Sequence, residues 1–67
     1  MNALKARIKK QGYSIRTFSR LVGMNTSTFY RKIKNNSFDI KEARRISLLL
    51  QLTSEEFEII FFGSIVA

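Results

Sequence analysis

Four polar residues that favour the start of a helix are spread through the chain, and each precedes apolar residues at helical spacing. They are Ser14, Asn25, Asp39 and Thr53. Side chains of this kind accept a hydrogen bond from a backbone N–H that the first turn of a helix leaves unpaired. One cap contributes only about 1 kcal/mol, so its agreement with the apolar spacing is the stronger indication. With a first helix over residues 2–11, the pattern predicts an all-α domain of five helices.

The chain is short, and this limits how it can be stabilised. Its 67 residues make a single domain, 1–67, and contain no Cys, no His and no Pro. Disulfides are therefore impossible and the usual zinc ligand sets are absent, so we expect no metal and no cofactor. Helix packing, with or without a second subunit, must provide the stability of so small a core.

The apolar residues of each predicted helix define an expected core. Hydrophobic staples, in which the residue before a cap packs on the fourth helical residue, are expected for Tyr13 with Phe18, Met24 with Phe29, and Leu52 with Phe57. Capping boxes are expected for Asp39 with Glu42 and for Thr53 with Glu56. The residues expected to face inward are Leu4, Ile8, Phe18, Leu21, Val22, Phe29, Ile33, Ile40, Ala43, Ile46, Leu48, Leu49, Leu50, Phe57, Ile60 and Phe61.

The last six residues, 62–67, are apolar and lack a helix signal, which predicts a short extended C-terminal tail. Two roles for Ile65 and Val66 stay open at this point. They either pair with a symmetry mate or fold back over the first helix.

The charge is strongly positive and unevenly distributed. Twelve Lys and Arg stand against five Asp and Glu, a net charge of +7. Residues 1–38 hold nine basic residues and no acid, whereas residues 46–67 hold three acids and no base. This asymmetry indicates a polyanionic partner for one face. Solubility alone is the competing interpretation, but the charge exceeds what so short a chain needs for it.

Residues 14–35 predict two short helices joined by a tight turn at Gly23-Met24-Asn25, a helix-turn-helix unit. This segment resembles the helix-turn-helix of the lambda repressor/Cro-like family, also called the XRE family. The ending Phe61-Phe62 to Val66-Ala67 resembles that of small regulators from phages of Gram-positive bacteria. The other features that carry the resemblance are Phe18-Ser19, Val22-Gly23-Met24, Asn25, Phe29, Arg31-Lys32-Ile33, Phe38-Asp39-Ile40 with Glu42, and Leu50 to Thr53.

The resemblance implies a five-helix phage or bacterial transcription regulator that binds double-stranded operator DNA as a homodimer. Its recognition helix, 26–34, would lie in the major groove. The base-reading residues implied by position are Thr26, Ser27, Tyr30 and Arg31. The residues implied to contact the DNA backbone are Lys34, Asn35, Asn36 and Ser37. Further candidates from their charge are Arg16, Arg20, Lys9 and Lys10. Hydroxyl groups bond either kind of base edge, and an arginine fork fits guanine, so the chemistry agrees.

Several of these residues have an alternative interpretation. Thr26 and Ser27 also suit the start of a helix, Tyr30 could cover the core, and Arg31 could hold a phosphate. Ile15 stands where the family commonly has a Gln that contacts the DNA backbone, and it cannot donate a hydrogen bond. Either Arg16 replaces that contact or Ile15 belongs to a protein interface. The second hypothesis is therefore a protein-interaction module, such as an antirepressor that binds another regulator.

Other functional classes fit the sequence poorly. Without His or Cys there is no ordinary nucleophile–base pair, and the carboxylates occupy helix starts or an outer face, so we expect no catalytic residues and no enzyme. No apolar run approaches the ~20 residues of a membrane span. The N-terminus lacks the apolar stretch of a signal peptide. We expect a cytoplasmic protein without a membrane partner.

Overall fold

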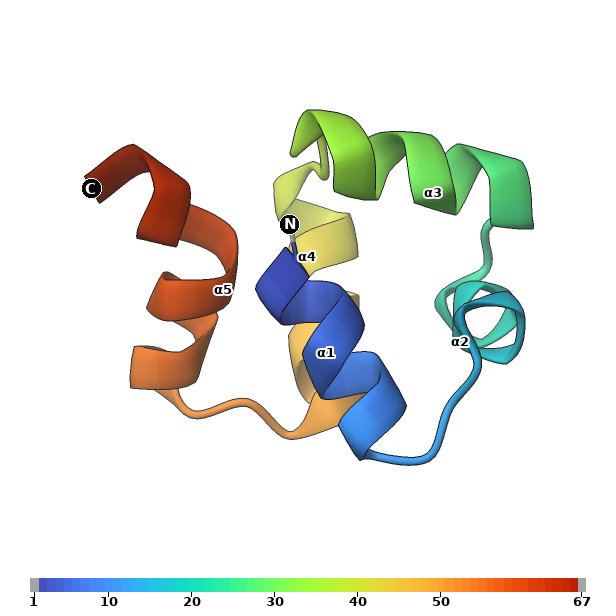
Figure 1. The fold of residues 1–67 in the computed structure, drawn as a ribbon, viewed down its shortest axis with the longest axis horizontal. Helices are drawn as coiled ribbons and strands as arrows, with labels where there is room; N and C mark the ends of the chain where they lie inside the picture. Colours follow the sequence, from blue (N-terminus) through green and yellow to red (C-terminus); the bar gives the residue numbers. More distant parts are fainter. Residues whose placement is uncertain (1, 67) are drawn as a thin grey trace.

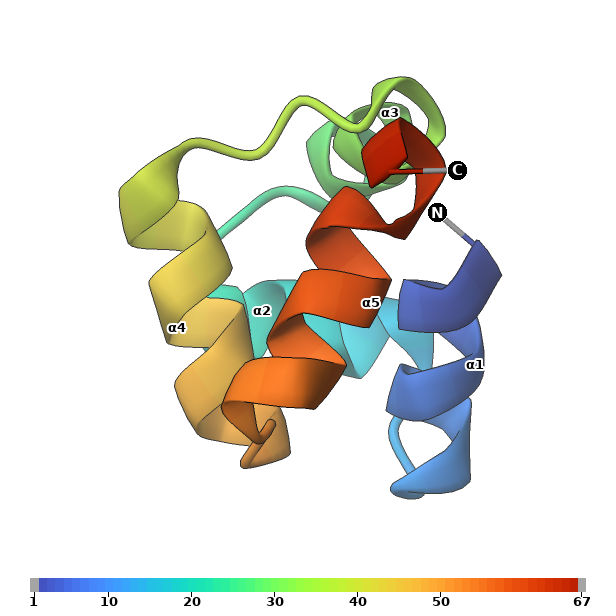
Figure 2. The same ribbon diagram turned by 90° about the vertical axis from the view of Figure 1, so that its left-hand side faces the viewer.

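The computed structural model describes residues 2–66, and the side chains of residues 2–63. These residues form five α-helices and no strand, which confirms the predicted all-α class (Figure 1). The helices are α1 (Asn2–Lys10), α2 (Ile15–Val22), α3 (Thr26–Asn35), α4 (Ile40–Leu50) and α5 (Ser54–Val66). Helices α1, α4 and α5 have roughly parallel axes, and α3 lies across one end of them (Figures 1 and 2).

The expected helix starts are confirmed by their hydrogen bonds. The backbone N–H of Thr17 donates to Ser14 Oγ at 3.1 Å, and that of Ser27 donates to Asn25 Oδ1 at 2.9 Å. Both capping boxes form as well. Asp39 and Glu42 exchange side-chain-to-backbone bonds of 2.7 and 3.0 Å, and Thr53 and Glu56 exchange bonds of 3.1 and 2.9 Å.

Left-handed residues follow four of the helices, and Gly12, with a φ of 88°, is the one that follows α1. Gly23 has a φ of 87°, a conformation that suits glycine because it has no Cβ. Asn36 and Gln51 take the same role after α3 and α4, with φ values of 51° and 53°. Helix α1 ends at Lys10, one residue earlier than expected. The guanidinium of Arg45 donates to the carbonyl oxygen of Val22 at 2.9 Å, so α4 satisfies an end carbonyl of α2.

The core is built from all five helices. The Tyr13–Phe18 staple is confirmed by a ring-centroid distance of 5.3 Å. A row of aromatic rings continues from it through the molecule, with centroid distances between 4.8 and 6.3 Å: Phe18, Phe29, Phe38, Phe61, Phe57 and Phe62. The buried apolar residues are Leu4, Ile8, Ile15, Phe18, Val22, Phe29, Ile33, Ala43, Ile46, Leu50 and Phe61.

Three residues expected in the core are exposed instead. Leu21 is half-exposed, and the exposed fractions of Ile40 and Leu48 are 80% and 72%. Helix α4 is apolar on more than one face, and its neighbours cover only the face of Ala43 and Ile46. The expectation that Ile40 belongs to the buried stripe of this helix, and that Leu48 broadens that stripe, was therefore wrong.

The predicted extended tail was also wrong, because α5 continues to Val66. No Pro interrupts α5, and its backbone bonds carry it through Gly63 despite the weak local signal. The roles suggested for the side chains of Ile65 and Val66, and for Ala67, lie outside the described residues.

Candidate nucleic-acid interface

The turn between α2 and α3 is held by a chain of hydroxyl contacts. Ser19 is fully buried, and its hydroxyl donates to the carbonyl oxygen of Arg16 at 2.7 Å. The hydroxyl oxygen of Thr26, the first residue of α3, lies 3.1 Å from Ser19 Oγ. These contacts fix the start of α3 against α2. The geometry of a helix-turn-helix is thus set by polar groups inside the turn as well as by apolar packing.

The same contacts determine the direction in which the Thr26 hydroxyl donates its proton. A carbonyl oxygen only accepts, so the single proton of the Ser19 hydroxyl is directed at Arg16. The Thr26 hydroxyl must then donate to Ser19 Oγ. Its remaining lone pairs can accept, and its methyl group stays apolar. With its proton directed at Ser19, the Thr26 hydroxyl can accept a hydrogen bond from the amino group of a base, and its methyl group can contact the methyl group of thymine. It has no proton left to donate to an acceptor on a base.

The outer face of α3 carries polar and basic side chains. Ser27, Arg31 and Lys34 are exposed and are spaced four and three residues apart, so they share the side opposite the buried Phe29 and Ile33. The Ser27 hydroxyl donates to Asn25 Oδ1 at 2.6 Å, which leaves it free to accept. Arg31 and Lys34 make no ion pair with any described residue. This face therefore offers unneutralised positive charge beside a hydroxyl acceptor.

Tyr30 is half-exposed and lies beside α1. The Lys5 ammonium is 5.9 Å from the centroid of its ring, within the range of a cation–π contact. Lys5, Tyr30, Arg31 and Lys34 line one hollow of about 390 Å³. The sequence prediction missed Lys5, since nothing in the chain connects it with a tyrosine so far along. Its membership of the basic stretch over residues 1–38 was the only available signal.

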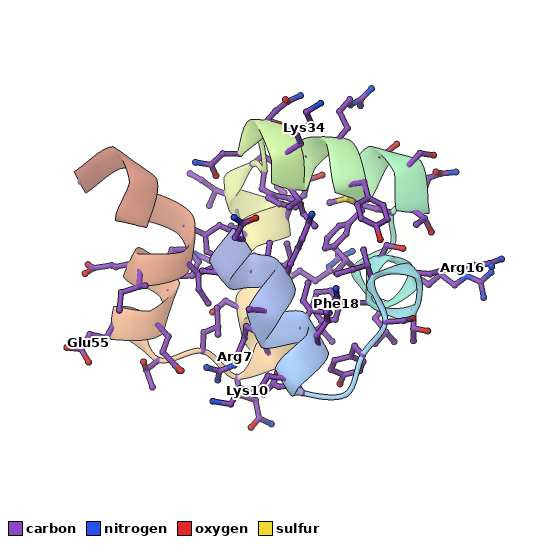
Figure 3. The ribbon with its side chains drawn as sticks, viewed as in Figure 1. Arg7, Lys10, Arg16, Phe18, Lys34 and Glu55 are labelled. Carbon is purple, nitrogen blue, oxygen red and sulfur yellow. The ribbon has the colours of Figure 1, made fainter. Side chains whose placement is uncertain are left out.

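A second basic hollow lies between α2 and the start of α3. Arg16 and Arg20 are one turn apart on α2, and both are exposed. With Met24, Asn25 and Thr26 they line a hollow of about 490 Å³. Arg16 points away from the molecule (Figure 3). The structure thus brings both predicted phosphate-binding arginines to the edge of the α3 face.

The residues at the end of α3 and in the loop after it are all exposed, as a contact with the DNA backbone requires. This group comprises Lys34, Asn35, Asn36 and Ser37. Asn36 is held in the left-handed region and the N–H of Ser37 donates to the carbonyl oxygen of Lys32 at 3.1 Å, so the loop is ordered. Lys34 lies on the outer side of α3 in Figure 3.

Two predicted contacts are not brought to this face. Lys9 and Lys10 belong to the end of α1 that points away from α3 (Figures 1 and 2). Lys10 lies at the opposite end of the molecule from Lys34 (Figure 3). It lines a hollow with Arg7 and Glu56 at the α1–α5 contact instead. A duplex lying along α3 would therefore be out of reach of Lys10.

Glu55 lies away from the outer face of α3, and two other acidic residues are held in ion pairs. Glu55 and Arg16 point to opposite sides of the molecule (Figure 3). Glu42 is paired with Lys32 at 2.6 Å, and Glu56 is paired with Arg7. Hydrogen bonds from the Arg7 guanidinium, and then from the backbone N–H of Thr53, hold the pKa of Glu56 below its ordinary value of 4.5. The basic side chains of Arg31 and Lys34, unpaired among the described residues, therefore lie on the outer face of α3, on a different side of the molecule from Glu55.

Ile15 does not have the exposure that a protein interface requires. Only 5% of its surface is exposed, and it belongs to the hydrophobic core. The expectation that Ile15 contributes to a protein interface was wrong. Its position at the first turn of α2 faces inward, and the neighbouring Arg16 is the side chain that reaches solvent.

Other kinds of site find no support in the part of the chain that the structure describes. Residues 2–66 contain no group of three or more His, Cys, Asp or Glu that could hold a metal ion. Within the same residues, no helix combines the length and apolar character needed to cross a membrane. Comparison with protein-family models, with curated proteins and with solved structures gives no match for this chain.

Proposed function

We propose that this chain is a sequence-specific DNA-binding transcription regulator of the lambda repressor/Cro-like type, from a phage or a bacterium. The observation that carries the proposal is the outer face of α3, where Arg31 and Lys34 are exposed and unpaired among the described residues. That helix follows a tight turn whose hydroxyl contacts fix it on α2. An exposed, rigidly held helix with basic side chains is what insertion into a major groove requires.

The residues divide by the part of DNA that they suit. Thr26, Ser27, Tyr30 and Arg31 lie along the first two turns of α3 and would meet base edges. Arg16 and Arg20 on one side, and Lys34 with the following loop on the other, would hold the two phosphate strands that border the groove. Phosphate contacts of this kind orient the protein without reading sequence, so affinity should fall steeply with salt.

A second function, binding to another regulator, has less support. One of the residues that favoured it, Ile15, is buried. A DNA-binding regulator would work in the cytoplasm of its host, where the DNA is. The proposal needs no catalytic residue and no cofactor.

Selection of bound duplexes from a random DNA pool tests the proposal. A sequence-specific regulator should enrich one short motif, and a dimer should enrich two copies of it related by a two-fold axis. A matched selection with Arg31→Ala should give a motif with reduced preference at one position. Recovery of no motif at all by the natural chain would contradict sequence-specific binding.

A further inference from the structure

The hollow beside Tyr30, of about 390 Å³, lies where the first half of α1 meets the second half of α3. It is lined by Asn2 and Lys5 from α1 and by Tyr30, Arg31, Ile33 and Lys34 from α3. The start of α1 is the end of that helix that lies toward α3 (Figures 1 and 2). Three of the lining side chains are positively charged and none is negatively charged. Two helices that are distant in the sequence thus bring their cations to one place.

The three cations of the hollow have no anionic partner among the side chains that the structure describes. The two ion pairs of the described residues use Glu56 and Glu42, and neither glutamate lines the hollow. Like charges gathered on one hollow repel each other, and salt screens this repulsion only in part. An anion in the hollow would relieve the repulsion and gain an attraction to each cation.

The ring of Tyr30 holds the Lys5 ammonium at the hollow. Lys5 is half-buried, whereas Lys9, the next lysine along α1, is exposed. The ammonium lies 5.9 Å from the ring centroid, and the negative face of an aromatic ring attracts a cation. Because this contact uses no acceptor atom, N–H groups of Lys5 stay available to an oxygen. A side chain that is already held in place also loses less entropy when a ligand binds.

We propose that this hollow is a phosphate-binding site, and that on DNA Lys5 holds a backbone phosphate there. The second part rests on the proposed function. Lys34 lines the hollow and also lies on the outer side of α3 (Figure 3), so the DNA strand that Lys34 would hold passes the hollow. A lysine ammonium suits a phosphate because it is a compact point charge with several donors. The phosphate-contacting surface thereby extends from α3 onto α1.

The slope of log affinity against log salt, measured on a duplex of random sequence, tests the contact with DNA. Lys5→Gln should reduce the magnitude of this slope by about 0.9, the contribution of one phosphate. Lys5→Arg keeps both the charge and the attraction to the ring, so it should keep the slope. Lys9→Gln is the matched control, because it removes the same charge from the end of α1 that points away from α3. It should leave the slope unchanged.

Two results would overturn the contact with DNA, once circular dichroism has shown that the variants are folded. One is a slope that Lys5→Gln leaves as it is in the natural chain. The other is an equal reduction by Lys5→Gln and Lys9→Gln, which would show that only the net charge of the chain matters.

Titration with inorganic phosphate, followed by NMR of the tyrosine ring signals, tests the hollow without DNA. The chain has two tyrosines, and Tyr13 packs on Phe18 and does not line the hollow. Phosphate should shift the ring signals of Tyr30 and leave those of Tyr13 in place. Lys5→Gln should abolish the shift and Lys9→Gln should retain it. No response of Tyr30, or the same response in Lys5→Gln, would overturn the phosphate site.

These measurements distinguish failure of this inference from failure of the proposed function. A chain that shows the Lys5-dependent slope but enriches no DNA motif loses sequence reading and keeps the phosphate contact. A chain that enriches a motif without a Lys5-dependent slope keeps its function and loses the contact. A chain that binds inorganic phosphate in the hollow but binds no duplex contradicts both the proposed function and the contact with DNA, and keeps only the site for a free phosphate.

Discussion

The hydroxyl oxygens of Ser19 and Thr26 lie 3.1 Å apart across the turn that joins α2 to α3. Ser19 is fully buried, and its hydroxyl donates a hydrogen bond to the carbonyl oxygen of Arg16. Thr26 is therefore held as a donor toward the protein and as an acceptor toward solvent. One contact thus links the stability of the turn to the chemistry that the first residue of α3 offers.

Replacing Ser19 should affect both stability and base preference. Ser19→Ala removes the acceptor for Thr26, and the loss of this buried hydrogen bond should lower the free energy of unfolding by about 1 kcal/mol. The released Thr26 hydroxyl can then donate as well as accept. On DNA, the preference for an amino-bearing base at its position should relax. Urea unfolding and site selection measure the two effects.

The control for this substitution is Ser54→Ala, at an exposed position in α5. Ser54→Ala should change neither the free energy of unfolding nor the base preference. If Ser19→Ala changes neither the free energy of unfolding nor the base preference, the hydrogen bonds of Ser19 with Arg16 and Thr26 do not organise the turn.

Arg31 and Lys34 should affect DNA binding in different ways. Arg31→Ala should reduce discrimination between the best site and its single-base variants by about 1–3 kcal/mol at one position. Lys34→Ala should weaken binding to all duplexes alike and reduce the slope of log affinity against log salt by about 1. Lys10→Ala, at the far end of the molecule, is the matched control for charge. Fluorescence anisotropy titrations distinguish these results, and equal effects of Lys10→Ala and Lys34→Ala would contradict the placement of DNA along α3.

The Arg7–Glu56 pair should make stability depend on acidic pH. The pKa of the folded Glu56 carboxyl lies below its ordinary value of 4.5, chiefly because Arg7 donates to it. The charged carboxylate therefore stabilises the fold above that pH, and this contribution is lost as the pH falls through the folded pKa. Glu56→Gln keeps the capping geometry but removes the charge. Its melting temperature should be lower at neutral pH and should fall less on acidification.

Glu55→Gln provides the comparison for that measurement, because Glu55 is exposed and makes no ion pair among the described residues. It should retain the acid dependence of the natural chain. If acidification lowers the melting temperatures of Glu56→Gln and of the natural chain equally, the Arg7–Glu56 pair does not contribute to the acid dependence of stability.

Ile15 should behave as a core residue. Ile15→Ala removes buried methyl groups and should lower the free energy of unfolding by about 2–5 kcal/mol. Ile59→Ala, at an exposed aliphatic position, should lower the free energy of unfolding far less. A small effect of Ile15→Ala on stability, combined with loss of a protein contact, would restore Ile15 to an interface role.

Local chemistry made the helix starts predictable from the sequence. The caps at Ser14, Asn25, Asp39 and Thr53 depend on residues within one turn of each other, so their side chains identify them. The ends of α2 and α3 follow from Gly23 and Asn36 for the same reason. The predicted start and end of the α2–α3 unit, and so the position of α3, required no knowledge of the rest of the fold.

Features that depend on neighbouring helices could not be predicted in this way. Ile40 and Leu48 have the spacing of buried residues, but no described helix covers them. A protein interface stayed open for Ile15 on the sequence alone, although the packing of α2 turns it inward. Lys5 approaches Tyr30 only because α1 lies beside α3. In each case the sequence identifies the type of side chain, while the packing of distant segments decides which face it occupies.

The central claim is that the outer face of α3 reads DNA sequence, and the most direct test is the ratio of two affinities. The natural chain is titrated, at one salt concentration near physiological, with the selected duplex and with a shuffled duplex of the same composition. We predict a ratio of at least about 10³ in favour of the selected site, the lower bound for specific DNA-binding proteins. Equal affinities for the two duplexes would contradict the account.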